Sequence, residues 1–255
     1  MQVNYIVLIF INFINKKFKK MSDDNNEPDY EILPDDTQRH DLSFKIIVIG
    51  DSGVGKSCLT MKATKNIFEN YYSPTIGFEF YTFNIRIKEK IIRLQIWDTC
   101  GQEVYRSLIN GFYRNSSLAI LVYSITSQKS FKNLEIWLND IKVNSNPDIK
   151  IFLIGNKKDL EEKREVPIDS AKKFFKDHGL YTFMESSAKT GFNAQKMFID
   201  AAHVLLEENT RLEQRFKNIS DKDKTKTAKI KLTHEDEIYS DTEDEQNNKK
   251  RRKCC

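Results

Sequence analysis

The sequence Gly-Asp-Ser-Gly-Val-Gly-Lys-Ser at residues 50–57 directly follows an apolar run at residues 44–49. Its spacing is G-x-x-x-x-G-K-[ST], in which glycines let the backbone curl so that successive N–H groups point at one anion. Lys56 supplies a positive charge for nucleotide phosphates, and Ser57 offers a hydroxyl to Mg²⁺. Residues 56–66 are predicted to form a helix, whose positive N-terminal end faces the same anion. The pattern therefore predicts a nucleoside triphosphate site rather than a chance glycine turn. The residues expected to contact phosphate are Asp51, Ser52, Gly53, Val54, Gly55, Lys56, Ser57 and Cys58.

Two other segments are expected to complete the phosphate and metal site. Asp98 ends a predicted strand and is placed to hold Mg²⁺, while Gly101 can offer an N–H to the γ-phosphate and Gln102 can orient the attacking water. Thr75 lies on a polar loop, where its hydroxyl can reach Mg²⁺ and its N–H the γ-phosphate. Gln102 is therefore the expected catalytic residue. The expected metal ligands are Ser57, Thr75 and Asp98.

Two short motifs later in the chain predict which base is bound. Asn-Lys-Lys-Asp at residues 156–159 and Ser-Ala-Lys at residues 187–189 each follow a predicted strand. The Asp159 carboxylate can accept two hydrogen bonds from the N1–H and N2–H₂ edge of guanine, a donor pair that adenine lacks, so the site should reject ATP. The Ala188 N–H can donate to guanine O6. Each motif alone is weak because charged surface runs are commonly only solvated, but all the motifs in this order favour a guanine nucleotide. The guanine-binding residues expected from these motifs are Asn156, Lys157, Asp159, Ser187, Ala188 and Lys189.

The elements that must position these residues alternate between strands and helices from Ser43 onward. Strands are predicted at residues 44–49, 78–87, 91–97, 117–124, 150–155 and 181–184, and helices at residues 56–66, 103–113, 131–144, 168–178 and 192–211. Such alternation predicts an α/β fold with a doubly wound sheet, which binds ligands at the carboxyl ends of its strands.

The sheet is predicted to be mostly parallel and six-stranded, with one antiparallel edge strand. Residues 119–123 and 151–155 are apolar on both faces, as in the middle of a parallel sheet covered by helices. Only residues 88–90 join the strands 78–87 and 91–97, and this link is too short for a crossover helix, so that pair must form a hairpin.

Composition limits the classes of function that the chain can have. Its 255 residues suit one domain of moderate size with tails, or two small domains. A net charge of +4 is mild and does not indicate a nucleic-acid binder. The four cysteines form neither a disulfide nor a zinc pattern, which fits a reducing cytosol.

The first 42 residues are predicted to be an N-terminal extension outside the folded domain. Residues 3–14 are mostly apolar and are followed by four lysines within residues 16–20. The stretch is short for a bilayer span and is a poor signal peptide. It is a membrane-contacting segment, a targeting sequence, or absent from the protein because Met21 is the natural start; we favour the third. Residues 21–42 are polar and acidic with two prolines, which predicts disorder.

The predicted domain covers residues 43–212, and residues 213–255 are predicted to be a flexible tail. Five consecutive basic residues, 249–253, precede the final Cys254 and Cys255. No residue follows the second cysteine, so the ending is not a C-a-a-X box.

Taken together, the chain resembles a small GTPase of the Ras superfamily and, within it, the Rab family. The resemblance covers about residues 43–211, as a P-loop NTPase G domain. The motifs that mark it as Rab-like are Ile76-Gly77-Phe78-Glu79-Phe80, Leu94-Gln95-Ile96-Trp97-Asp98-Thr99, Tyr105-Arg106-Ser107 and the double-cysteine end.

The resemblance implies roles for further residues. Phe68 should stack on the guanine base, and Tyr72 should close over the phosphates. Phe80, Trp97 and Phe112 match the aromatic triad that effectors contact in Rab proteins, although plain core packing is the alternative. The expected effector surface comprises Ile76, Gly77, Phe78, Phe80, Trp97 and Phe112. Rab proteins with this ending carry geranylgeranyl groups on both cysteines, here Cys254 and Cys255; the alternative is a frayed terminus with two unmodified thiols.

The resemblance also implies an activity and its partners. The expected protein is a membrane-anchored switch in vesicle-mediated transport that binds GTP or GDP with Mg²⁺ and hydrolyses GTP slowly until an activating protein accelerates it. The expected partners are effectors, an exchange factor, a GTPase-activating protein, an escort protein and a dissociation inhibitor, at the cytoplasmic face of an endomembrane. The alternatives are a GTP-binding scaffold with negligible hydrolysis, a small-molecule kinase on the same phosphate loop, and a pseudo-GTPase that binds no nucleotide.

Overall fold

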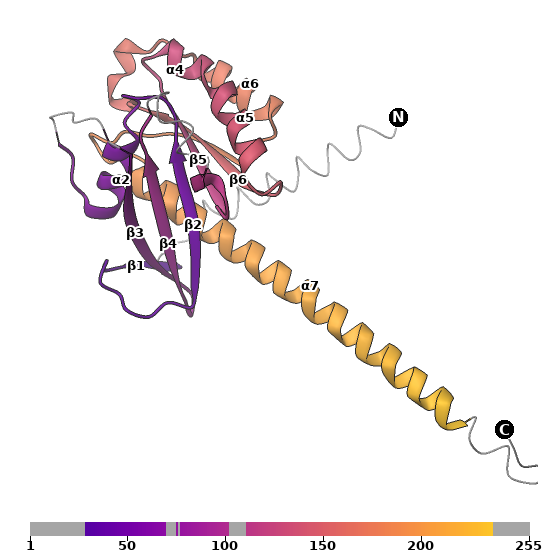
Figure 1. The fold of residues 1–255 in the computed structure, drawn as a ribbon. Helices are drawn as coiled ribbons and strands as arrows, with labels where there is room; N and C mark the ends of the chain where they lie inside the picture. Colours follow the sequence, from indigo (N-terminus) through magenta and orange to yellow (C-terminus); the bar gives the residue numbers. More distant parts are fainter. Residues whose placement is uncertain (1–28, 70–74, 76, 102–110, 237–255) are drawn as a thin grey trace, which may run out of the picture. The chain divides into compact units, whose positions relative to one another are not determined.

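The structure is a computed structural model that describes residues 29–69, 75, 77–101 and 111–236, with side chains as far as residue 219. It divides into two compact units after Leu205. The strands are β1 (Tyr30–Leu33), β2 (Leu42–Ile49), β3 (Phe78–Ile87), β4 (Lys90–Thr99), β5 (Leu118–Ser124), β6 (Lys150–Asn156) and β7 (Thr182–Glu185). The helices are α2 (Lys56–Lys65), α4 (Gln128–Lys132), α5 (Leu134–Asn144), α6 (Ile168–Asp177) and α7 (Ala194–Asp236), with a 3₁₀ helix η2 (Lys158–Lys163) (Figure 1).

A seven-stranded sheet in the order β1-β3-β4-β2-β5-β6-β7 forms the centre of the first unit. The strands from β4 through β2, β5, β6 and β7 pair in parallel, while β3 pairs antiparallel with β4 and with β1. The α/β fold with a mostly parallel sheet is therefore confirmed, but the sheet has seven strands rather than six.

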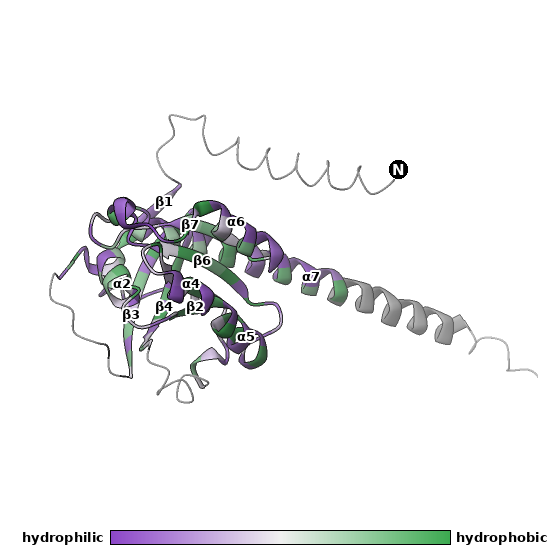
Figure 2. Cartoon of the chain, turned by 90° about the horizontal axis from the view of Figure 1, so that it is seen from above, coloured by the Kyte–Doolittle hydropathy of each residue, from purple (hydrophilic) through white to green (hydrophobic). Residues whose placement is uncertain are grey.

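Alternating side chains of the central strands build two cores, one on each face of the sheet. Ile47 and Ile49 of β2 belong to a buried cluster that includes residues of α5 and α6. Ile46 and Val48, which alternate with them along β2, are fully buried on the other face. On that face Phe83 of β3 packs against Phe198 of α7 with ring centroids 5.7 Å apart. All seven residues of β5 are buried, and β6 is coloured as hydrophobic over most of its length (Figure 2). Burial on both faces explains why the middles of these strands are apolar.

The seventh strand corrects the prediction of disorder for residues 29–42, whereas residues 21–28 of that predicted segment lie outside the described residues. β1 pairs with the end of β3, and the segment that joins β1 to β2 is held by the buried Asn84. The Asn84 amide donates to the carbonyl oxygens of Pro34 at 2.8 Å and Asp35 at 3.3 Å, and its oxygen accepts from Arg93 Nε at 3.0 Å. Because a buried amide must be hydrogen-bonded, these bonds favour one conformation of the segment that joins β1 to β2. Its polar composition alone predicts disorder.

Among the described residues, the helices differ from prediction at two places; of the helix predicted over residues 103–113, only residues 111–113 are described. The helix predicted over residues 131–144 is two helices, α4 and α5, which meet at Asn133. The helix predicted over residues 192–211 is α7, which begins at Ala194 and continues to Asp236, through residues 213–236 of the predicted tail. That segment contains no glycine or proline and many Lys residues, which favour helix. Within the described part of the chain, no helix combines the length and apolar character needed to cross a bilayer.

Candidate nucleotide site

The loop between β2 and α2 has a backbone that only glycine adopts easily. Gly53 and Gly55 have φ values of 77° and 93°. A Cβ on Gly50 would lie 2.1 Å from the carbonyl oxygen of Val122, and one on Gly55 would lie 2.5 Å from Asn156 Nδ2. These close approaches bring the loop against the ends of β5 and β6, at the carboxyl edge of the sheet, where doubly wound folds bind their ligands.

Lys56 begins α2 and points back across this loop. Its side chain is buried, and Nζ donates to the carbonyl oxygens of Gly50 at 2.8 Å and Asp51 at 2.9 Å. Burial lowers the pKa of Lys56, an effect that the charge of Asp98 opposes. An ammonium held at the centre of an anion-binding loop is arranged to bind phosphate oxygens.

Gly101 connects the phosphate loop to the segment that follows β4. A Cβ on Gly101 would lie 2.4 Å from Lys56 Nζ and from the backbone nitrogen of Ser52. No larger residue fits here, so Gly101 lies directly against the phosphate loop.

The expected metal ligands come together beside Lys56. Ser57 Oγ and Thr75 Oγ1 lie 2.6 Å apart. Both carboxylate oxygens of Asp98 are buried and have no hydrogen-bond partner among the described residues. Burial raises the pKa of Asp98 to about 7, although the proximity of the Ser57 hydroxyl, which bonds to Thr75, and of the Lys56 charge acts in the opposite direction.

This set of oxygens fits Mg²⁺. A buried carboxylate without a partner needs a cation or a proton, and Mg²⁺ prefers one or two protein oxygens together with water and substrate phosphates. Among the described residues, no group of three or more His, Cys, Asp or Glu side chains could hold a metal ion. When bound, Mg²⁺ would be held through Ser57, Thr75 and Asp98 and would neutralise charge on the phosphates.

A cavity of about 720 Å³ opens over the phosphate loop. It extends from the loop and Lys56 past Thr75 to Glu79 and Tyr81 of β3, and it does not include Asn156 or Asp159. The Tyr81 hydroxyl donates to the Glu79 carboxylate, and burial, together with that bond, raises the pKa of Tyr81. The cavity therefore marks the phosphate side of the site and not its base side.

Asn156 joins the phosphate loop to the two guanine motifs. Its amide nitrogen donates to the carbonyl oxygen of Val54 at 2.9 Å, and its side-chain oxygen accepts from the Ala188 N–H at 3.2 Å. Asp159 Oδ1 accepts from the Ser187 hydroxyl at 2.6 Å. The side chain of Asp159 stays exposed, so its second oxygen can face a ligand.

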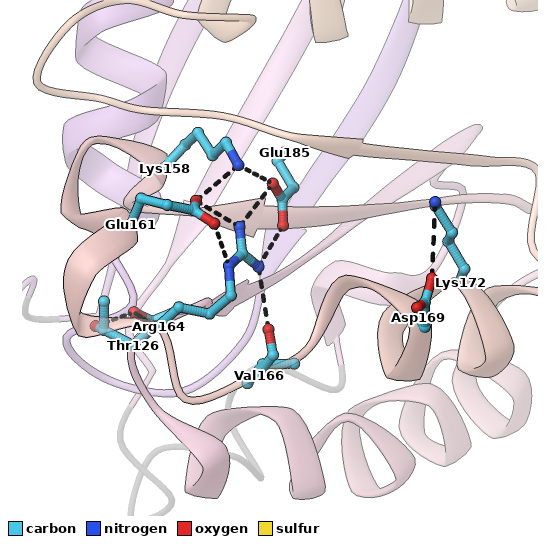
Figure 3. Close-up of polar contacts among 9 residues, drawn as sticks. Thr126, Lys158, Glu161, Arg164, Val166, Asp169, Lys172 and Glu185 are labelled. Atoms are coloured by element: carbon cyan, nitrogen blue, oxygen red, sulfur yellow. Dashed lines mark hydrogen bonds and ion pairs between the residues drawn. The ribbon is translucent and has the colours of Figure 1, made fainter.

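Four charged residues outside the predicted set tie these two motifs together. Arg164 donates to Glu161 through two nitrogens, each at 2.7 Å, and to Glu185 through two nitrogens at 2.7 and 2.9 Å. Lys158 Nζ contacts the same two carboxylates at 2.7 and 3.0 Å. Figure 3 shows both cations between the two acids, with Arg164 also donating to the Val166 carbonyl oxygen at 3.0 Å. We call Lys158, Glu161, Arg164 and Glu185 the charged network.

The charged network changes the protonation of its acids. Burial alone would raise the pKa of Glu185, but hydrogen bonds from Arg164 and Lys158 outweigh burial and lower it. The same two donors lower the pKa of Glu161 to about 2. Because Lys158 precedes Asp159 and Glu185 precedes the Ser-Ala-Lys motif, the network fixes one guanine motif against the other.

The predicted effector residues form an aromatic patch. Phe78 and Phe80 are 45% and 49% exposed, so the alternative of plain core packing is wrong for Phe80 of the predicted triad, whereas Trp97 and Phe112 are half-buried. The Trp97 ring lies 5.2 Å from those of Phe78 and Phe112 and 5.3 Å from that of Phe80. Lys45 Nζ lies 5.3 Å from the Trp97 ring centroid. We call Phe78, Phe80, Trp97 and Phe112 the aromatic patch.

Several predicted residues lie outside the described part of the chain or apart from the site. Phe68 is half-buried and is not among the residues lining the cavity, although Ile67 and Glu69 are. Lys189 is exposed after β7, and Gly77 precedes β3 with a φ of 76°. Predictions that fall outside the described residues concern Gln102, Tyr72, Ile76, Cys254 and Cys255.

The sequence patterns do not indicate Glu161, Arg164 and Glu185, nor do they indicate Asn133 and Trp137, which contact Asp51 of the phosphate loop. The basic and acidic run at residues 158–165 carries charge but gives no indication of its partner in β7.

A comparison with protein families gives one finding: the model of the Ras family matches residues 45–207. The match covers most of the chain and includes every segment of the site described above.

Proposed function

The chain belongs to the Ras family of small GTPases, and on this premise we propose that it is a Rab-like, membrane-anchored switch in vesicle-mediated transport. The aromatic patch carries this proposal, because four large aromatic side chains gather beside Gly77 and two of them are close to half exposed. Exposed aromatic clusters mark protein-binding surfaces.

The switch would act through the two segments that flank the patch. Thr75 lies at the cavity two residues before Gly77, and Gly101 lies two residues after the end of β4. A γ-phosphate that binds the Thr75 and Gly101 N–H groups would order both segments, and hydrolysis would release them. Phe78 and Phe80 follow the first segment on β3, and Trp97 precedes the second on β4, so the shape of the patch would report which nucleotide is bound.

Hydrolysis would use Gln102 to orient the attacking water and Mg²⁺ to neutralise phosphate charge. No arginine in the described part of the site reaches toward the cavity lining. Unaided turnover is therefore expected to be slow, with a partner protein supplying the missing positive charge.

Membrane attachment would come from the C-terminal sequence. Cys254 and Cys255 follow five basic residues, 249–253. Two lipid chains anchor a protein stably where one does not, and each basic residue adds roughly 1 kcal/mol near an anionic leaflet. The protein would then cycle between the cytosol and the cytoplasmic face of an endomembrane, with an escort protein and a dissociation inhibitor as partners.

Prenylation with purified components tests this proposal. GDP-loaded protein is incubated with geranylgeranyl diphosphate, Rab escort protein and the Rab transferase, and its intact mass is measured. The proposal predicts a mass increase of two geranylgeranyl groups and binding to anionic vesicles, both lost in the Cys254→Ser/Cys255→Ser variant. An unmodified chain in this assay would contradict the proposed membrane anchoring while leaving nucleotide binding unaffected.

A further inference from the structure

Asp51 places a carboxylate inside the loop that is built to bind phosphate. A negative charge there repels the ligand unless the carboxylate is turned away and its charge is compensated. The structure shows that it is turned away: Asp51 Oδ1 accepts from Trp137 Nε1 at 2.7 Å, and Oδ2 accepts from Asn133 Nδ2 at 2.7 Å. Both distances are short, as expected for hydrogen bonds to a charged acceptor.

The two donors come from a rigid part of the fold. Trp137 is 3% exposed and lies on the face of α5 that also carries Leu134, Leu138 and Ile141, all buried in the core. Its indole N–H needs an acceptor because a buried donor without one is costly. Asn133 is the residue at which α4 ends and α5 begins, so the break in the predicted helix presents its amide to the loop.

The main chain of Asp51 faces the phosphate site. Its carbonyl oxygen accepts from Lys56 Nζ at 2.9 Å, and its carbonyl carbon would lie 2.4 Å from a Cβ on Gly101. One residue therefore contacts α5 through its side chain, and Lys56 and Gly101 through its backbone. Movement of the carboxylate would move the backbone that positions the phosphate-binding groups.

From this geometry we propose that Asp51 is a positioning residue, which Asn133 and Trp137 hold so that the loop keeps its phosphate-binding conformation. The inference rests on the nucleotide binding of the family. It predicts that the two hydrogen bonds slow the dissociation of guanine nucleotides by acting on the phosphate side of the site alone.

Dissociation of fluorescent GDP, chased with excess GDP in the presence of Mg²⁺, tests the proposal. Trp137→Phe keeps an aromatic ring but removes the donor, and Asn133→Ala removes the other donor. Since a hydrogen bond to a charged group is lost in each case, we expect roughly tenfold faster dissociation in either variant. Asp51→Ala should accelerate release at least as much, and adding Trp137→Phe to it should have little further effect, because the two residues act through one contact.

Two controls separate positioning from general destabilisation. Ile141→Val removes a methyl group from the same face of α5 without touching Asp51, so it should lower the unfolding temperature and leave GDP dissociation at the parent rate. The ratio of IDP to GDP dissociation rates should stay at the parent value in all Asp51, Asn133 and Trp137 variants, because the base of IDP differs from guanine only in lacking the 2-amino group.

Three results would overturn the inference. Dissociation at the parent rate in folded Trp137→Phe and Asn133→Ala would show that the contacts do not act on the nucleotide. Strict additivity of Asp51→Ala with Trp137→Phe would show that they are not coupled. A changed IDP-to-GDP ratio would place the effect on the base side. A parent protein that binds no GDP would overturn the family-level function itself, which is a distinct outcome measured first.

Discussion

Replacing Arg164 by methionine should destabilise the fold and weaken nucleotide binding together. Arg164 donates to Glu185 at 2.7 and 2.9 Å and to the Val166 carbonyl oxygen at 3.0 Å. Methionine occupies a similar volume but donates no hydrogen bond. The Glu185 side chain is 7% exposed, and its carboxylate then keeps one cation of the charged network, Lys158, whose Nζ lies 3.0 Å from Glu185 Oε2.

The size of the effect follows from burial. Removing one partner of a buried ion pair costs roughly 3–5 kcal/mol. Because Lys158 still neutralises Glu185 in part, we expect a loss of about 2–3 kcal/mol in the free energy of unfolding. The contacts of Arg164 with the exposed Glu161 contribute little by comparison.

Urea unfolding at neutral pH measures this loss, and it should be run at two GDP concentrations. Weaker GDP binding lowers apparent stability by mass action, and the difference between the two concentrations isolates that part. The control is the double variant Arg164→Met/Glu185→Gln, which leaves no uncompensated carboxylate at position 185 and should recover about 1 kcal/mol relative to the single variant. A double variant less stable than Arg164→Met, or a single variant as stable as the parent, would refute the reasoning.

Three further predictions follow from the same geometry. Gly55→Ala should abolish GDP binding in a titration, because its Cβ would meet Asn156 Nδ2 at 2.5 Å, whereas Gly53→Ala, with nothing within 4 Å, should bind more weakly but measurably. Folding lowers the pKa of Glu185 below its ordinary 4.5, so the stability that this carboxylate contributes is present above pH 4.5 and is lost as the pH falls through the lowered pKa. Glu185→Gln should therefore remove that loss of stability at acid pH, measured by thermal unfolding at a series of pH values. Chelating Mg²⁺ should speed GDP release from the parent by about tenfold or more, a loss of 1.4 kcal/mol or more, and should have much less effect on Asp98→Asn; equal acceleration in both would exclude Asp98 as a metal ligand.

The sequence predicted the parallel sheet and most of the site because both depend on local patterns. The strand Phe78–Ile87 was predicted with the observed bounds, since its hairpin is set by the short link to the next strand. The phosphate loop, Asn156 and Ala188 lie together because each follows a strand, and carboxyl ends of parallel strands meet at one edge.

What the sequence did not predict depends on contacts between distant residues. Residues 30–33 form a strand because β3 offers a free edge and Asn84 satisfies the following turn, neither of which composition reveals. The helical pattern of residues 131–144 does not indicate the break at Asn133. The Asn133 side chain there donates to Asp51, which lies 82 positions away in the sequence. Glu185 and Arg164 likewise pair across 21 positions.

The aromatic patch shows how a local pattern can leave two interpretations open. Aromatic residues on a strand fit a core as well as a binding surface. Phe83 of β3 is 2% exposed while Phe80 is 49% exposed, so the same strand supplies both. Helix α7 covers one face of the strand, where Phe198 packs against Phe83. The position of this helix therefore decides which aromatic residues of β3 are buried and which face solvent.

Nucleotide selectivity together with turnover tests the central claim most directly. GTP, GDP and ATP are titrated against the protein with Mg²⁺, and GTP hydrolysis is then followed in a single turnover for the parent and for Gln102→Leu. We predict tight binding of GTP and GDP, no competition by ATP, slow hydrolysis in the parent and slower hydrolysis in the variant. Competition by ATP, or hydrolysis by Gln102→Leu at the parent rate, would contradict the account of a guanine-nucleotide switch built around Asp159 and Gln102.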